Sequence, residues 1–173
     1  MAKTYEPIAT TTLSSAQSSV TFSSISGSYT DLVVIISALG NVGSPTDYGI
    51  SLQINGDASG SYSDTWLYGN GTSTVSSRRI DQSSIVDIQA AGYLSTTSPN
   101  PCVVNFLNYS NTTTYKTIIS RGNNPSGGGG TATTEACVGL WRSTSAITSI
   151  KFLTTSGSYG SGSIFTLYGI KAA

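Results

Sequence analysis

Short stretches of alternating apolar and polar residues recur along this chain. Val20 and Phe22 alternate with hydroxyl residues, and Ile50, Leu52 and Ile54 alternate with polar residues in the same way. This period of two is typical of antiparallel strands that have one buried and one exposed face. No window places apolar residues at helical spacing between helix caps. The predicted strands are residues 5–13, 19–25, 31–39, 48–55, 65–69, 85–91, 102–109, 115–121, 134–142, 147–154 and 164–171.

Many short strands separated by turn residues predict an all-β fold. We expect one domain over residues 1–173, an antiparallel β-sandwich of about 8–11 strands with jelly-roll topology and essentially no helix. Asn-Gly pairs at residues 55–56 and 70–71 favour the tight turns of hairpins. Residues 122–130 are rich in glycine and predict a flexible loop between two strands of the same domain.

The longest apolar run covers residues 32–36, far below the roughly 20 residues that span a bilayer. Because it is apolar on both faces, it predicts a central strand or a strand that faces a neighbouring subunit. The first residues contain no apolar segment of a signal peptide, so we expect synthesis and assembly in a cytoplasm. Cys102 and Cys137 are then predicted to be reduced, buried thiols. A disulfide between them requires that their strands be neighbours in the sheet.

Charged residues are scarce, at 9% of the chain against roughly 25% in average soluble domains. The formal net charge is zero, which argues against nucleic acid and anionic membranes as partners, because both require an excess of basic residues. A surface so poor in charge has little electrostatic defence against association. The composition therefore predicts a protein that is assembled or that presents a neutral, hydroxyl-rich face to a partner.

Motifs for catalysis are missing from the sequence. The chain has no histidine, which excludes a Ser-His-Asp triad and histidine metal ligands, and its two cysteines do not make a zinc site. We predict no catalytic, cofactor-binding or metal-binding residues, and no enzyme activity. Asp57 and Asp64 are interpreted as loop acids, with a glycosidase pair, or a calcium site that includes Asn55, as the alternatives. The pair at residues 78–79, two arginines, is interpreted as solvated loop charge or a partner anchor.

Aromatic residues are concentrated around one predicted hairpin. Tyr62, Trp66 and Tyr68 lie close together there, as expected for a platform that stacks sugars or fills pockets of a partner. The alternative is alternate core and edge packing. Further along, the pattern favours a core position for Leu140 or Trp141, but not for both.

Several segments resemble small virion proteins of tailed bacteriophages, especially phages of aquatic bacteria including cyanobacteria. The segments are residues 5–13 (YEPIATTTL), 20–22 (VTF), 29–32 (YTDL), 55–57 (NGD), 68–71 (YGNG), 139–150 (GLWRSTSAITSI) and 167–173 (LYGIKAA). The resemblance covers most of the chain, and its motifs are structural rather than catalytic.

The resemblance implies a non-enzymatic virion protein that is made in the host cytoplasm. We expect a capsid decoration (cement) protein that forms a symmetric trimer on the shell. Its expected partners are further copies of the same chain and the major capsid protein. The N-terminal arm, residues 1–13, and the apolar strand are the expected contacts. The candidate interface residues are Tyr5, Pro7, Ile8, Leu32, Val34 and Ile36. The alternative is a tail fibre or baseplate module, or a host-glycan-binding domain, with the aromatic hairpin as its receptor platform.

Overall fold

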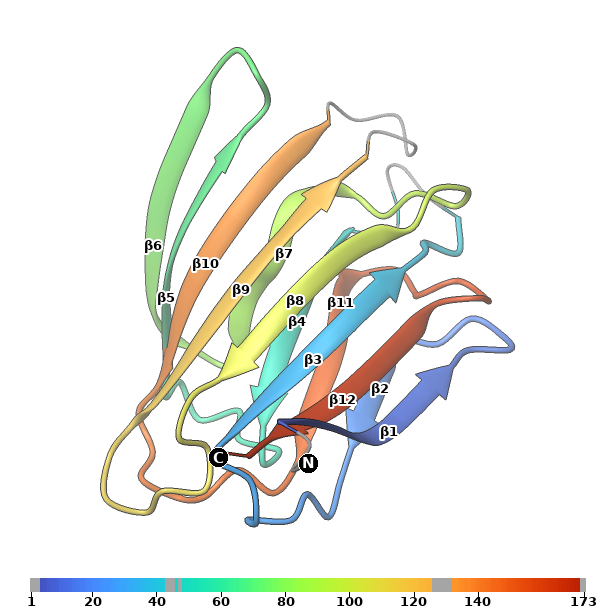
Figure 1. Ribbon diagram of the computed structural model, residues 1–173. Helices are drawn as coiled ribbons and strands as arrows, with labels where there is room; N and C mark the ends of the chain where they lie inside the picture. Colours follow the sequence, from blue (N-terminus) through green and yellow to red (C-terminus); the bar gives the residue numbers. More distant parts are fainter. Residues whose placement is uncertain (1–3, 43–45, 47, 126–131, 172–173) are drawn as a thin grey trace.

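The chain folds into an antiparallel β-sandwich of twelve described strands in two sheets (Figure 1). The computed structural model describes residues 4–42, 46, 48–125 and 132–171, and none of these residues is helical. In spatial order the large sheet contains β1 (Tyr5–Thr12), β12 (Ile164–Ile170), β3 (Asp31–Ala38), β8 (Asn100–Phe106), β9 (Lys116–Asn124), β10 (Thr133–Trp141), β5 (Tyr62–Gly69) and β6 (Thr74–Gln82). The small sheet contains β2 (Ser19–Phe22), β11 (Ile150–Ser156), β4 (Tyr48–Ile54) and β7 (Ile85–Tyr93).

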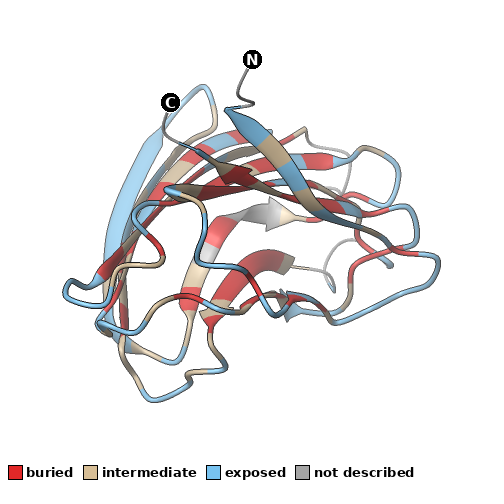
Figure 2. Cartoon of the chain, turned by 60° about the horizontal axis from the view of Figure 1, so that its bottom comes forward, coloured by how far each residue is buried: buried red, intermediate tan, exposed pale blue. Residues whose placement is uncertain are grey.

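The antiparallel sandwich predicted from the alternation is confirmed. All eleven predicted strands correspond to observed strands, and β6 is the additional one, so the predicted count of 8–11 is too low. The side chains of β6 are exposed along almost its whole length, which explains why its sequence shows no alternation (Figure 2). The jelly-roll topology remains a prediction.

Turns and loops differ in part from the expectation. Asn55 and Gly56 have φ values of 54° and 69°, as the predicted tight turn requires, but this turn leads from β4 to β5 in the other sheet and closes no hairpin. The turn at residues 70–73 does close the hairpin between β5 and β6. Residues 122–124 of the predicted glycine-rich loop belong to β9, and residues 126–130 lie outside the described part of the chain.

The core lies between the sheets, where the inward-facing side chains of both form one continuous apolar cluster. Phe152 of β11 lies at its centre, with ring centroids 6.5 Å from Phe22 and 5.8 Å from Phe165. Val20 and Phe22, and likewise Ile50, Leu52 and Ile54, are buried as their alternation predicts. Within the described residues, no helix is present that has the length and apolarity to cross a membrane.

Candidate functional site: the outer face of the large sheet

The outer face of the large sheet, the side that points away from the small sheet, differs from the predicted interface. Leu32, Val34 and Ile36 are fully buried and point into the sandwich, so they are not surface contacts. Their neighbours Val33 and Ile35 point outward, and Ile35 is 46% exposed. The strand is apolar on both faces and central in its sheet, between β12 and β8, as predicted. An apolar run of this kind does not reveal which alternate set of residues faces the core.

The N-terminal interface candidates lie at one edge of the same sheet. Tyr5 is 59% exposed and Pro7 is exposed, and both are paired in register with outward-facing residues of β12. Ile8 is partly buried against the core. Residues 1–3 of the predicted arm lie outside the described part of the chain.

A band of partly or largely exposed apolar side chains crosses the outer face from β3 to β5. Ile35, Val138 and Leu67 are 46%, 50% and 57% exposed. The strand register places their neighbours between them on the same face, because side chains two residues apart share a face. The apolar band consists of Ile35, Val103, Ile119, Ala136, Val138 and Leu67.

One exposed arginine interrupts this band, and a second lies beside its end on β6. Arg121 of β9 lies in one row across the sheet with Val103 and Ala136, and Arg78 of β6 lies opposite Thr65 of β5. Neither makes a side-chain hydrogen bond or an ion pair within the described residues. Both guanidinium groups are therefore available to a partner.

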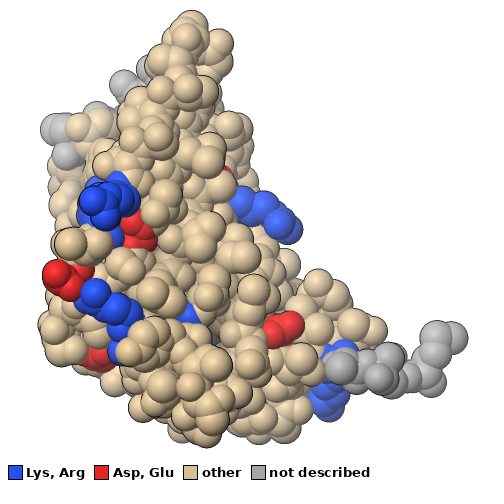
Figure 3. Space-filling model, turned by 90° about the vertical axis from the view of Figure 1, so that its left-hand side faces the viewer, with Lys and Arg blue, Asp and Glu red and all other residues tan. Residues whose placement is uncertain are grey.

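Other charged side chains form small groups of mixed sign on a largely uncharged surface, as the view onto the β6 edge shows (Figure 3). In the ion pairs, the charged atoms lie 2.8 Å apart in Glu6–Lys171, 3.6 Å apart in Asp64–Arg79 and 2.5 Å apart in Asp81–Arg142. Lys116 is buried and donates to the carbonyl oxygens of Thr114 and Thr144, at 2.7 and 3.2 Å, and burial lowers its pKa.

A shallow hollow of about 300 Å³ lies beside Arg121. Outward-facing Pro101 and Val103 of β8 line one side, and Arg121 and Asn123 of β9 line the other. The backbone of Gly122 forms part of its wall. The hollow has room for an apolar side chain of a partner protein. A carboxylate beside that side chain could then reach the guanidinium of Arg121.

The aromatic hairpin does not expose all three residues of the predicted platform. Tyr62 is fully buried, and its hydroxyl accepts from Ile54 N at 2.8 Å and lies 3.2 and 3.1 Å from the carbonyl oxygens of Ile54 and Asp57. Its ring is stacked on Trp141 at 6.5 Å. Burial raises the pKa of Tyr62 to about 12. Tyr62 is thus part of the core, and so is Trp141, in agreement with the prediction that only one of Leu140 and Trp141 is buried.

Trp66 and Tyr68 do lie together, on the inner side of β5, with centroids 5.6 Å apart and planes at 14°. The guanidinium carbon of Arg79 lies over the Trp66 ring at 5.4 Å, and Arg79 pairs with buried Asp64 at 3.6 Å. Trp66 therefore lies against two neighbours of its own chain, and the role of Trp66 and Tyr68 as a glycan platform stays a prediction. Arg78 and Arg79 belong to β6, which corrects their assignment to a loop, and they point to opposite faces.

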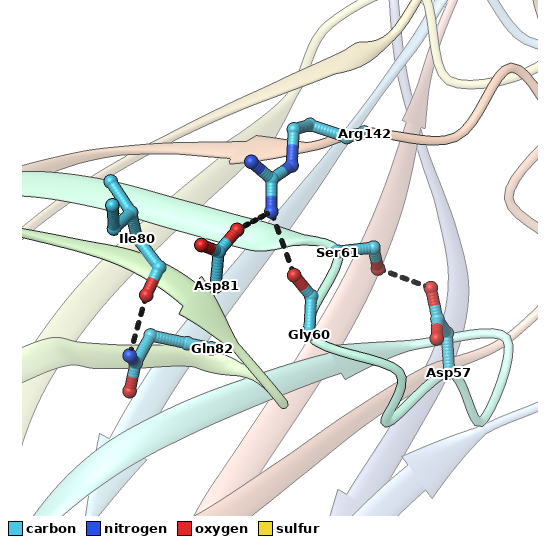
Figure 4. A network of polar contacts seen from close by, with 7 residues as sticks. All are labelled: Asp57, Gly60, Ser61, Ile80, Asp81, Gln82 and Arg142. Carbon is cyan, nitrogen blue, oxygen red and sulfur yellow. Dashed lines mark hydrogen bonds and ion pairs between the residues drawn. The ribbon is translucent and has the colours of Figure 1, made fainter.

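The acidic residues considered for catalysis or calcium belong to separate structural networks. Asp57 accepts hydrogen bonds from Ser59 N and Oγ at 2.9 and 2.6 Å and from Trp141 Nε1 at 2.7 Å. It also accepts a hydrogen bond from Ser61 Oγ (Figure 4). The hydrogen bonds from Ser59, Ser61 and Trp141 hold the pKa of Asp57 well below its usual range. Asn55 Oδ1 accepts from the backbone N–H groups of residues 148 and 149.

These contacts satisfy Asp57 and Asn55 within the fold. Asp64 is buried on β5, which corrects its interpretation as a loop acid, and its carboxylate faces the Arg79 guanidinium of β6 at 3.6 Å. Among the described residues, no group of three or more acidic, cysteine or histidine side chains is arranged to hold a metal ion.

Both cysteines are free and buried, as predicted. Cys102 lies on β8 and Cys137 on β10, and β9 separates these strands, so the condition for a disulfide is not met. Burial raises the pKa of the Cys102 thiol, which makes it a poor nucleophile.

Comparisons of the chain with protein-family models, with curated proteins and with solved structures each find no match.

Sequence reasoning missed Ile35, Leu67, Arg121 and Val138 as surface residues of one face. On β9, buried Ile118 and Ser120 alternate with outward residues that include Arg121. On β10, buried Cys137 and Gly139 alternate with outward residues that include Val138. This alternation was a usable signal, because it defines the two faces of each strand. Which face is outside became clear only from the packing of β7 against β10, β9 and β5.

Proposed function

We propose that this chain is a non-enzymatic structural protein of a phage virion, a capsid decoration protein that binds the shell through the outer face of its large sheet. The observation that carries the proposal is the apolar band, which no other described segment of the chain covers. Exposed apolar patches that are contiguous and rimmed by polar residues mark interaction sites in soluble proteins. Thr65, Thr117 and Ser76 supply such a rim.

The path of the chain supports this proposal. Without the hairpins β5–β6 and β9–β10, the sheets have the orders β1-β12-β3-β8 and β2-β11-β4-β7. Successive strands then alternate between the sheets, except for β4 and β7, which are paired neighbours in the small sheet. We infer from this arrangement an eight-stranded jelly roll with two inserted hairpins, both on the large sheet. Jelly rolls are common in capsid proteins, which agrees with the resemblance to phage virion proteins.

Decoration would act by mass action. A protein that binds the assembled lattice, but not its separated subunits, stabilises the lattice by a free energy that grows with its concentration. Self-association into a trimer is part of the proposal, with the β1 edge, where Tyr5 and Pro7 are exposed, as the subunit contact. This edge lies across the sheet from β6, so it leaves Arg78, Arg121 and the β8–β6 part of the outer face free.

The test is the copy number of the chain in purified virions, measured by quantitative mass spectrometry against the major capsid protein. The proposal expects hundreds of copies, approaching one per capsid subunit. Adding the purified chain to shells that lack it should raise their disruption temperature. A few dozen copies or fewer would overturn the decoration role in favour of a tail-associated module, and absence from virions would overturn both.

A further inference from the structure

We propose that the outer face docks on a protein surface that presents carboxylates around apolar side chains, with Arg78 and Arg121 as its two cationic anchors. An apolar side chain of the partner occupies the hollow beside Arg121. This inference rests on the proposed function, because it specifies the chemistry of the lattice surface to which the same face binds.

The first argument is the distribution of charge. The five strands from β8 to β6 in the large sheet carry three described carboxylates, Asp64, Asp81 and Glu135. Asp64 and Glu135 are buried toward the inner side, and Asp81 is bound to Arg142 at 2.5 Å. This half of the outer face therefore carries two unpaired positive charges and no described counter-charge. Arginine suits such a site because its planar fork pairs with carboxylates in two parallel hydrogen bonds.

The second argument is geometry. Arg121 and Arg78 are three strands apart and offset by one row, which corresponds to roughly 15 Å at ordinary strand spacing. Val138 and Leu67, both at least half exposed, lie on the two strands between them. Arginines among and beside exposed apolar side chains are typical of specific protein interfaces, where arginine is enriched.

The same observations argue against other occupants. A second copy of the chain that used this face in a two-fold contact would bring arginines toward arginines, without a carboxylate to receive them. Nucleic acid is disfavoured because two arginines supply few phosphate contacts and the apolar side chains between them would be left facing a charged backbone. A carboxylate-bearing protein surface satisfies both the arginines and the apolar band.

The experiment measures binding of the purified chain to shells of the encoding virus that were assembled without it, by co-sedimentation over a range of salt concentrations. Arg121→Gln and Arg78→Gln each should weaken binding about 10-fold, and the double variant about 100-fold. Both single variants should also bind with a shallower dependence on salt. Val138→Thr, which keeps the β-branched shape, tests the apolar part and should weaken binding several-fold.

The matched control is Lys151→Gln, which removes one positive charge from the outer side of β11 in the small sheet. It should bind as the unchanged chain does. Equal binding by Arg121→Gln and Lys151→Gln would overturn the inference while the decoration role stands. Failure of the unchanged chain to bind shells would instead overturn the proposed function. A change of oligomeric state on Arg121→Gln, seen by sedimentation velocity, would show that this face binds a second copy and would also overturn the inference.

Discussion

The four hydrogen bonds that the Asp57 carboxylate accepts predict that Asp57→Asn destabilises the fold. One carboxylate oxygen accepts both donors of Ser59, and the other accepts Ser61 Oγ and Trp141 Nε1. An asparagine keeps the first oxygen but replaces the second with an NH₂ group, which cannot accept from the indole. Trp141 is buried, so its N–H would be left without an acceptor.

The magnitude follows from these contacts. A buried donor without a partner costs about 1–3 kcal/mol, and hydrogen bonds to a charged group contribute about 1.5–3 kcal/mol each, so we expect a loss of about 2–3 kcal/mol at neutral pH. For a chain of this length, the unfolding temperature should fall by about 4–12 °C. The matched control is Asp81→Asn, the same chemical change in the exposed ion pair with Arg142, which should cost less than about 1 kcal/mol.

The assay is chemical unfolding of four proteins in a double-mutant cycle with Trp141→Phe. Because phenylalanine has no N–H to leave unpaired, Asp57→Asn should cost about 1–2 kcal/mol less in that background. An equal cost in both backgrounds would refute the assigned role of the indole hydrogen bond. If Asp57→Asn costs no more than Asp81→Asn, the stabilising role of the hydrogen bonds to Asp57 is refuted.

The same carboxylate gives a pH dependence of known sign. The folded chain holds Asp57 deprotonated to a lower pH than the unfolded chain does, because the pKa of Asp57 is lowered from its usual 3.8 on folding. As the pH falls through about 4, the unfolded state takes up the proton first and stability is lost. The difference in unfolding free energy between the unchanged chain and Asp57→Asn should therefore shrink below that pH, and a difference that is constant from pH 7 to pH 3 would contradict it.

Three further changes test the packing, each by chemical unfolding. Tyr62→Phe should cost about 1–3 kcal/mol, because Ile54 N would lose its buried acceptor; no loss would contradict the hydrogen bond. Gly139→Ala should cost about 1–3 kcal/mol, because the new Cβ would lie 2.4 Å from Ile85 Cδ1; Ile85→Val, which removes that atom, should restore part of the loss. Ile36→Ala should cost about 2–5 kcal/mol and Ile35→Ala under about 1 kcal/mol, and the reverse order would contradict the assigned faces of β3.

The sequence predicted the fold class well because most strands bury one face. Val20, Phe22, Ile50 and Leu52 report their burial through simple alternation. The strand β6 was missed for the opposite reason. Its side chains are exposed except for partly buried Arg79 and Gln82, so they give no periodic signal, and its place at the sheet edge is decided by pairing with β5.

The candidate site was predicted less well, for two physical reasons. A run such as residues 32–36 is apolar on both faces, so only tertiary packing decides that Ile36 is buried and Ile35 exposed. Aromatic content likewise does not distinguish platform from core. Tyr62 is buried, and its hydroxyl is satisfied by Ile54, which is eight residues away and in the other sheet. Arg121 was not singled out because a lone arginine in a strand has meaning only beside its cross-strand neighbours.

In the proposed docking, the hairpins β5–β6 and β9–β10 separate the residues of recognition from most residues of the fold. Arg121, Val138, Leu67 and Arg78 lie on β9, β10, β5 and β6 respectively, outside the eight strands that remain when the two hairpins are left out. Along β5, β9 and β10, one set of alternate residues completes the core and the other set is free of it, whereas β6 is exposed along almost its whole length. Under the proposed function, substitutions in the outward set would change which surface the protein recognises while the sandwich keeps its stability, so a lineage of such proteins would follow a changing shell by altering a few exposed positions.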